Sequence, residues 1–257
     1  MTMAIPGIMK LMYRNIRVNV DPGTLIILIG LPAMYLVFFG FGFGAMIPGG
    51  GATAYLIFLT PGIMSFQCVM AGTVGGSMLW ADRRWGMLAQ ILVGPFTRLR
   101  YLLGIMFTSL LFGLAGAFVM LIGAFLIIGT SLQVTLWGAL TAFGVIAIGS
   151  IFFGSLMLLV SGLVKSNNAY NSIQILIIFV VNFASTVFYS FSNSLPIPIQ
   201  VLFQINPLTY VANAARGGFV GALPAACSWQ IPLLVVETIV VLATATRVYV
   251  KSEISFV

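Results

Sequence analysis

The chain has 257 residues, of which 61% are hydrophobic and 6% are charged, and its formal net charge is +7. Soluble domains carry about 25% charged residues, so this composition indicates an integral all-α membrane protein. The chain has no histidine and only four acidic residues, which excludes histidine-based catalytic triads, paired intramembrane carboxylates and clustered metal ligands. We therefore expect no catalytic centre, bound metal or cofactor in this chain, and we attribute the positive charge to membrane topology rather than to nucleic acid.

The first predicted element is an amphipathic helix over residues 4–20. Apolar side chains recur at spacings of mostly three and four, while Lys10, Arg14 and Arg17 share another face. This pattern is typical of a helix that lies in the plane of the lipid headgroups. A solvated basic tail is the alternative. The sequence Asp21-Pro22-Gly23 ends the helix and turns the chain into the membrane.

Six apolar stretches follow, and each is long enough to cross a bilayer. A polar stretch over residues 81–100 separates the second from the third, and an irregular stretch over residues 192–228 precedes the sixth. We expect a single transmembrane domain over residues 1–257, in which Pro32 kinks the first span. The predicted spans are residues 24–43, 55–80, 101–129, 135–164, 173–191 and 229–247.

The placement of the cations predicts the orientation of this domain. Ten of the 11 basic residues lie before the first span, in the second or fourth connection, or after the last span, and only Arg216 falls on the other side. Lysine and arginine accumulate on the cytoplasmic side of membrane proteins. Both termini and residues 81–100 are therefore predicted to be cytoplasmic, and residues 192–228 external.

The stretch 81–100 holds five of the 15 charged residues (11 basic and four acidic). Its middle, Trp85–Phe96, is amphipathic, so we predict a short cytoplasmic helix that ends at Pro95. Such a helix offers a docking site for a partner outside the membrane. The alternative is a basic loop that sets the topology and contacts only lipid headgroups.

Two motifs together resemble the type II ABC exporter permease family. The first comprises Asp82 to Leu88, then Gln90-Ile91-Leu92, Pro95 and Thr97-Arg98, and the second is Asn206-Pro207-Leu208-Thr209-Tyr210 followed by Arg216. In that family the first motif is a cytoplasmic helix after the second span, and the second precedes the last span on the external side. The six-span layout is also similar. One departure is Arg84, which stands where the family often has a second acidic residue.

The resemblance implies the transmembrane subunit of an ATP-driven exporter, paired with a second copy or a related permease. No G-x-x-x-x-G-K-[ST] phosphate loop exists in the sequence, so ATP and magnesium would bind to a separate ATPase subunit. The scarcity of charge favours a lipophilic or amphipathic substrate, such as a drug-like compound, a lipid or a lipid-linked glycan. The residues expected to couple to the ATPase are Asp82, Arg83, Arg84, Trp85, Gly86, Gln90, Pro95 and Arg98.

Two other function classes stay open on the sequence alone. A secondary transporter or channel that works without ATP would need inverted repeats or intramembrane ion sites, and neither is evident. A membrane scaffold that transports nothing is the third possibility. An external segment that dips back into the membrane argues mildly against the scaffold.

Polar side chains on the predicted fifth span recur near one face at helical spacing, and polar groups that face hydrocarbon are costly. They either form hydrogen bonds between packed helices or line a translocation path, and the resemblance favours the path. Gln67, on the second span, is a weaker candidate for the same path. The path candidates on the fifth span are Asn171, Gln174, Asn182, Thr186 and Tyr189.

Two further features carry functional hypotheses. Glu237 is the one ionisable residue deep in a predicted span. It could serve as a proton-coupling site, as a contact for a cationic substrate or as a neutral hydrogen-bond donor. Residues 192–228 are predicted to form two short re-entrant helices broken at Asn206-Pro207. The resemblance implies that these helices form an external gate that includes Asn206, Pro207, Tyr210 and Arg216, whereas a fixed surface cap is the alternative.

Overall fold

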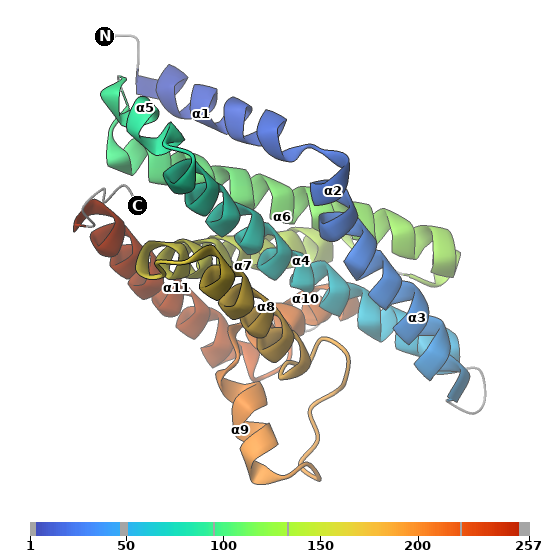
Figure 1. Ribbon diagram of the computed structural model, residues 1–257. Coiled ribbons are helices and arrows are strands. Elements are labelled where there is room, and N and C mark those ends of the chain that lie inside the picture. Colours follow the sequence, from blue (N-terminus) through green and yellow to red (C-terminus); the bar gives the residue numbers. More distant parts are fainter. Residues whose placement is uncertain (1–3, 47–50, 95, 133, 222, 252–257) are drawn as a thin grey trace.

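The structure is a computed structural model that describes residues 4–46, 51–94, 96–132, 134–221 and 223–251. The described residues form helices and no strands, which confirms the all-α prediction (Figure 1). The helices are α1 (Ala4–Asn19), α2 (Pro22–Leu25), the π-helix η1 (Ile26–Gly30), α3 (Leu31–Met46), α4 (Gly51–Arg84), α5 (Met87–Val93), α6 (Arg98–Ile128), the 3-10 helix η2 (Gly129–Ser131), α7 (Leu136–Leu163), α8 (Asn167–Phe183), α9 (Ile197–Ile205), α10 (Pro207–Val220) and α11 (Cys227–Lys251).

Five of the described helical segments are long and apolar enough to cross a membrane: Pro22–Met46, Gly51–Arg84, Arg98–Ile128, Leu136–Leu163 and Cys227–Val250. They correspond to the first, second, third, fourth and sixth predicted spans. The kink expected at Pro32 takes the form of the π-helical turn η1, directly before it. A proline removes one backbone hydrogen bond, and a local change of helical pitch accommodates that loss.

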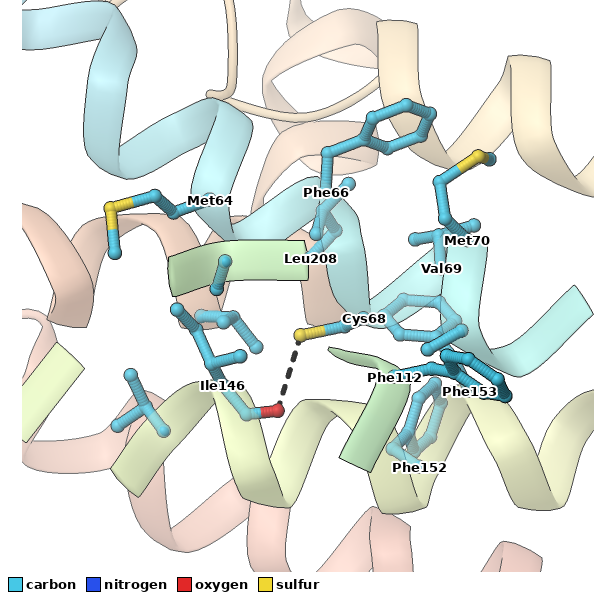
Figure 2. Packing of buried hydrophobic residues seen from close by; sticks show 14 of the residues in the cluster. Met64, Phe66, Cys68, Val69, Met70, Phe112, Ile146, Phe152, Phe153 and Leu208 are labelled. Atoms are coloured by element: carbon cyan, nitrogen blue, oxygen red, sulfur yellow. Dashed lines mark hydrogen bonds between the residues drawn. The ribbon is translucent and has the colours of Figure 1, made fainter. Parts of the chain in front are cut away.

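Helix α4 is the central element of the bundle. It has 34 residues, about 51 Å at 1.5 Å per residue, and every residue from Leu59 to Gly76 is buried. Helices α3, α6, α7 and α10 pack around it. In Figure 2, Cys68 of α4 donates a hydrogen bond of 3.3 Å to the Ile146 carbonyl of α7, among Met64, Phe112 and Phe153. Cys68 is therefore a packing residue, and both cysteines are free and buried.

Small residues allow the neighbouring helices to approach α4 closely. A Cβ atom on Gly72 would lie 2.7 Å from the backbone of Phe153, and one on Gly75 would lie 2.3 Å from the Ser109 hydroxyl. Contacts this short admit no side chain, so α4 meets the backbone of α7 at Gly72 and the Ser109 side chain of α6 at Gly75. Close approach through small residues is the usual way in which helices associate in membranes.

The fifth predicted span differs from the structure at both ends. Helix α8 covers Asn167–Phe183 rather than residues 173–191. It begins earlier because the Ser166 hydroxyl accepts a hydrogen bond from the backbone N–H of Ala169 and so caps the polar first turn. It ends at Phe183, and residues 184–191 continue without helical structure.

The non-helical residues nevertheless continue along α4. At one end of α4, the Trp80 indole donates a hydrogen bond of 2.7 Å to the side chain of Asn167. At the other end, the Tyr55 hydroxyl donates one of 3.0 Å to the Phe188 carbonyl. The chain from residue 167 to residue 188 therefore follows α4 over nearly its whole length, although its helix has only 17 residues.

The predicted loop 81–100 is mostly helical. Helix α4 continues to Arg84, and Gly86, with φ of 68°, makes the left-handed turn that ends it. The predicted helix Trp85–Phe96 is shorter in the structure, where α5 covers only Met87–Val93 and stops at Gly94 in extended conformation. Pro95 lies outside the described residues. Thr97 caps α6, because its hydroxyl accepts from the Arg100 backbone N–H.

One end of the bundle gathers the basic residues. Arg83, at the end of α4, donates to the Ser161 carbonyl near the end of α7, and Arg98, at the start of α6, donates to the Val250 carbonyl near the end of α11. The beginning of α1 and the end of α11 also lie at this end (Figure 1). We call it the basic end. Arg216 belongs to α10, which packs among the core helices away from this end.

The close contact at Gly72 generates a prediction. Gly72→Ala should lower the free energy of unfolding by about 1–3 kcal/mol, because the new methyl group overlaps the Phe153 backbone. The measurement is reversible or detergent-induced unfolding of the purified protein. Gly144→Ala on α7 is the control, because nothing lies within 4 Å of its Cβ and alanine favours a helix. Equal stability of the two variants would contradict the close packing of α4 on α7.

Candidate functional site

The acidic residue of the first motif points into the protein rather than toward a partner. Asp82 is buried and accepts hydrogen bonds of 2.7 Å from Arg14 Nη1 of α1 and from the Tyr101 hydroxyl of α6. A second bond to Arg14 makes this a two-pronged ion pair, and the bond to Asp82 raises the pKa of Arg14 above its ordinary value. Asp82 therefore joins α1, α4 and α6 at the basic end.

The sequence pattern did not reveal this contact. The periodicity of α1 predicts that Arg14 shares a lipid-facing polar surface with Lys10 and Arg17, but Arg14 turns inward while the other two are exposed. Asn15 is also buried and donates to Thr108 of α6 at 3.4 Å. Helix α1 therefore packs along the start of α6. The one signal for this packing in the sequence is the asparagine beside Arg14, a polar residue without charge in a basic helix.

The two arginines of the motif lie in different surroundings. Arg83 is half-buried, donates to the Ser161 carbonyl at 2.8 Å and lies 5.9 Å from the centre of the Trp80 ring. Arg84 is exposed and lies over the Trp85 ring at 5.7 Å. Of the two, only Arg84 is free to meet a partner without first breaking contacts within the bundle.

Helix α5 presents apolar side chains at the basic end. The side chain of Trp85 is 76% exposed and that of Val93 is 90% exposed, and Gln90 is exposed between them. Leu88 is buried and holds α5 against the bundle. Large apolar side chains that project from a polar surface mark interaction sites more often than lone exposed residues do.

The polar side chains of α8 and the following segment do not share one environment. Gln174 accepts a bond of 3.3 Å from Ser77 of α4, Asn182 is buried, and the Thr186 hydroxyl donates to Asn213 of α10. Asn171 and Tyr189 are exposed. Gln174 and Thr186 thus bind other segments of the bundle, the buried amide of Asn182 has no hydrogen-bond partner among the described residues, and two candidates remain on the surface.

Gln67 lies apart from the other path candidates. It is fully buried, and a Cβ atom on Gly116 of α6 would come within 2.5 Å of its side-chain oxygen. Its amide group has no partner among the described residues. The Gln67 side chain therefore faces α6. Helix α8 contacts α4 elsewhere, at Ser77 and Trp80.

Asn206 joins two helix ends at the Asn-Pro motif. Its side-chain nitrogen donates to the carbonyls of Val181 and Ala184, both at 2.7 Å, and its side-chain oxygen accepts from the Leu208 backbone N–H at 3.0 Å. The first two bonds satisfy the end of α8, and the third caps α10. Pro207 fits the first position of α10 because that position needs no N–H donor. Tyr210 closes the junction by donating to the Gln204 carbonyl of α9.

Arg216 fastens α10 to two other segments. Its guanidinium donates to the carbonyls of Phe58, Thr186 and Val187, and it lies 3.9 Å from the centre of the Phe58 ring. No described carboxylate contacts it, so main-chain oxygens and the ring stabilise the charge. The structure therefore places Arg216 inside the bundle.

Glu237 lies midway along α11 and is partly buried. Its Oε2 atom is buried without a hydrogen-bond partner among the described residues. The three roles considered from the sequence therefore stay hypotheses. The described residues hold no group of three or more histidine, cysteine, aspartate or glutamate side chains that could bind a metal ion.

Comparison with known protein families identifies the family of this chain. The sequence profile described as "ABC-2 type transporter" matches residues 8–220, which is most of the chain. The chain belongs to the ABC-2 type transporter family. It is thus a multi-pass membrane permease of the ABC transporter class. No curated protein matches the sequence.

The match covers α1 from Ile8 to the end of α10, and so includes both motifs. The ABC-2 permease domain lacks a nucleotide-binding domain, and permeases of this family work with ABC ATPase subunits. This membership confirms the resemblance seen in the sequence. It does not specify a substrate.

The Asp82–Arg14 pair generates a prediction for α1. Arg14→Met and Asp82→Asn should each lower the free energy of unfolding by about 1–3 kcal/mol, because each leaves a partly buried polar group without its partner. The double variant should cost less than the sum of the two, since the second change removes a group that is already unpaired. Unfolding of the four proteins checks this, and strict additivity would contradict the ion pair.

Asn206→Asp distinguishes the donor role of Asn206 at the helix junction from its acceptor role. Aspartate can still accept from Leu208, but it cannot donate to Val181 or Ala184, so two buried carbonyls lose their donor. We expect a loss of about 2–4 kcal/mol in the free energy of unfolding. Asn193→Asp, at an exposed position before α9, is the matched control. Equal stability of both variants would show that the junction does not depend on donation from Asn206.

Proposed function

We propose that this chain is the permease half of an ATP-driven exporter of a lipophilic or amphipathic substrate. The observation that carries the proposal is the surface formed by α5 and the turn before it, where the exposed side chains of Val93 and Trp85 project at the basic end. The chain has no phosphate loop, so ATP hydrolysis by a separate subunit must be coupled through such a surface. Family membership supports an ABC ATPase as that subunit.

The basic end supports a cytoplasmic location for α5 and for both termini, because lysine and arginine accumulate on that side. In this proposal residues 167–188 provide a sixth crossing, since they follow α4 from Trp80 to Tyr55. Helix α8 covers the cytoplasmic part of this crossing. The non-helical part survives at membrane depth because its carbonyls bind Tyr55, Asn206 and Arg216.

The exposed face of α8 supports an apolar translocation path. Ile175, Leu176, Phe179 and Val180 are exposed along it, whereas Gln174 turns toward α4. At its far end lies a groove of about 720 Å³ lined mainly by apolar side chains, including Phe183. A path of this character suits a lipophilic or amphipathic molecule better than a highly charged one.

The same face supports a pair of permeases. An apolar face of α8 can lie against lipid or against a second permease, and two permeases facing each other would enclose a path between their α8 helices. A second copy and a related permease would both form such a pair. Closure of the two ATPase subunits would then move α5 and, through the end of α4, the helices around the path.

Helices α9 and α10 serve in this proposal as the external gate. Figure 1 shows α9 projecting from the bundle, whereas α10 is enclosed by α4, α7 and α11. Asn206 and Arg216 connect α10 to the end of α8 and to residues 186–187. A shift of α8 would therefore be transmitted to α10 through hydrogen bonds rather than through loose packing.

The test is co-reconstitution of the permease with its ATPase in liposomes, with export measured across a panel of drugs and lipids. Trp85→Ala and Val93→Ala should each lower substrate export and substrate-stimulated ATP hydrolysis by about tenfold, as loss of a buried interface anchor does. The free ATPase should keep its own hydrolysis rate. Insertion and stability of the permease should be unchanged, because both side chains are exposed.

Trp137→Ala is the matched control. Trp137 is 77% exposed, as Trp85 is, but it lies in the first turn of α7 at the opposite end of the bundle. Export by this variant should equal that of the parent protein. If Trp85→Ala exports normally, or if Trp137→Ala loses export equally, α5 is not the coupling surface.

A further inference from the structure

A polar cleft of about 650 Å³ opens at the basic end, apart from the surface of α5. It lies between the last turns of α4 and the connection from α7 to α8. The residues that matter for its chemistry are Trp80, Arg83, Arg84, Lys165, Ser166 and Asn167. None of these except Arg83 and Arg84 belongs to the coupling motif.

The cleft is strongly positive. Three cations line it, namely Arg83, Arg84 and Lys165, and no carboxylate lines it among the described residues. Of the described acidic residues, Asp82 is bound to Arg14 and Tyr101, and Asp21 caps α2 through Thr24. Like charges in one cleft repel, so their gathering favours an anionic occupant.

The start of α8 adds to this charge. The first backbone N–H groups of a helix have no acceptor within the helix, and they carry its positive dipole end. Ser166 and Asn167, which line the cleft, form that start, and α8 is 17 residues long. A phosphate group is the anion that helix starts and arginine side chains bind together most readily.

Two walls of the cleft are held in place before any ligand arrives. The Arg83 guanidinium is fixed by the Ser161 carbonyl at 2.8 Å and by the Trp80 ring. Trp80 in turn donates to Asn167 at 2.7 Å and stacks on Tyr170 at 5.6 Å between ring centres. Arg84 and Lys165 are exposed and can adjust to the ligand. A site with part of its donors fixed loses less entropy on binding.

An exposed stripe leads away from the cleft along α8. It starts at the polar residues Asn168, which lines the cleft, and Ser172, and continues at spacings of three or four residues through the apolar residues Ile175, Phe179 and Phe183. The whole stripe spans about 23 Å at 1.5 Å per residue, and its apolar part from Ile175 to Phe183 spans about 12 Å. Phe179 and Phe183 also line the groove of about 720 Å³ at the far end of the stripe.

We propose that the cleft binds the phosphate headgroup of an anionic amphiphile whose apolar part lies along the exposed stripe of α8. The headgroup would contact Arg84, Lys165 and the start of α8, while Arg83 fixes the wall behind it. That such an amphiphile is also the exported substrate rests on the proposed function. The binding step itself needs only the permease.

A carboxylate of a docked ATPase would be a different occupant of the same cleft. The stripe favours the amphiphile, because a water-soluble subunit would leave an apolar surface along α8 uncovered. The cleft also reaches Asn168, on the exposed face of α8, rather than Trp85 or Val93 of the coupling surface. These two observations favour a ligand that extends into the membrane.

The test measures lipid binding by the purified full chain in the absence of ATPase. The probes are phosphatidylglycerol and phosphatidylcholine in nanodiscs or mixed micelles, with native mass spectrometry or retained lipid as the readout. The parent protein should prefer phosphatidylglycerol. Arg84→Gln/Lys165→Gln should weaken that preference by about tenfold or more, because each cation near an anionic lipid contributes about fivefold.

The matched control is Arg17→Gln/Arg247→Gln, which removes two exposed cations outside the cleft and leaves the same net charge. It should keep the parent's preference for phosphatidylglycerol. If both double variants lose the preference equally, or if neither does, the cleft is not the headgroup site. All four side chains are exposed, so their replacement removes no buried contact, and an unfolding curve for each variant verifies that it folds.

Two further measurements distinguish other sources of the anion. If glycerol phosphate or inorganic phosphate binds as tightly as phosphatidylglycerol, the stripe contributes nothing and the amphiphile proposal is wrong. If Arg84→Gln/Lys165→Gln weakens ATPase binding while lipid binding is unchanged, the cleft is a docking site for an acidic protein surface. Failure of lipid binding would leave the Trp85 and Val93 results untouched, so the two proposals fail separately.

Discussion

A broken helix in a membrane exposes carbonyl and amide groups that lipid cannot satisfy, and this constraint shapes the less regular half of the molecule. Helix α8 stops at Phe183, yet the chain continues beside α4 to Phe188. The freed carbonyls find donors from other segments: Asn206 binds those of Val181 and Ala184, and Arg216 binds those of Thr186 and Val187. The Asn-Pro motif and Arg216 therefore do one physical task, which is to supply donors for the carbonyls left where α8 ends.

The opposite half depends on α4 and on its close contacts. Residues Leu59 to Gly76 are buried without interruption, and glycines bring α7 into backbone contact with α4 and let α6 side chains pack against it. At the basic end, Asp82 continues this arrangement by joining α1 and α6 to α4. Helix α8 is the contrast, because only Tyr170 and Asn182 are buried along it.

Burial divides the first motif into two kinds of residue. Asp82 and Arg83 hold contacts within the bundle, whereas Trp85 and Gln90 are exposed. Gly86 makes the left-handed turn between the end of α4 and α5. The motif therefore combines residues that stabilise the bundle with residues that remain on its surface. The cleft beside it adds a second basic surface, whose residues come from α4 and from the connection between α7 and α8.

The sequence by itself predicted the class of protein, five of the long spans (out of six expected), a common side for ten cations and the two family motifs. Those features follow from composition and from local periodicity, which require no knowledge of distant contacts. It also predicted two short helices around Asn206-Pro207, because proline and asparagine act locally. The length of α5 and the bounds of α8 were predicted less well, since caps from Gly86, Ser166 and Asn206 set them.

Only the tertiary structure decided which polar side chains face inward. Helical spacing places Gln174, Asn182 and Thr186 near one face, but it cannot say whether a neighbouring helix or a substrate meets that face. The pairing of Arg14 with Asp82, 68 residues apart, and of Arg216 with Phe58, 158 residues apart, depends on how the helices pack. Such long-range contacts carry no periodic signal in a single sequence, because their partners are set by the arrangement of helices around α4.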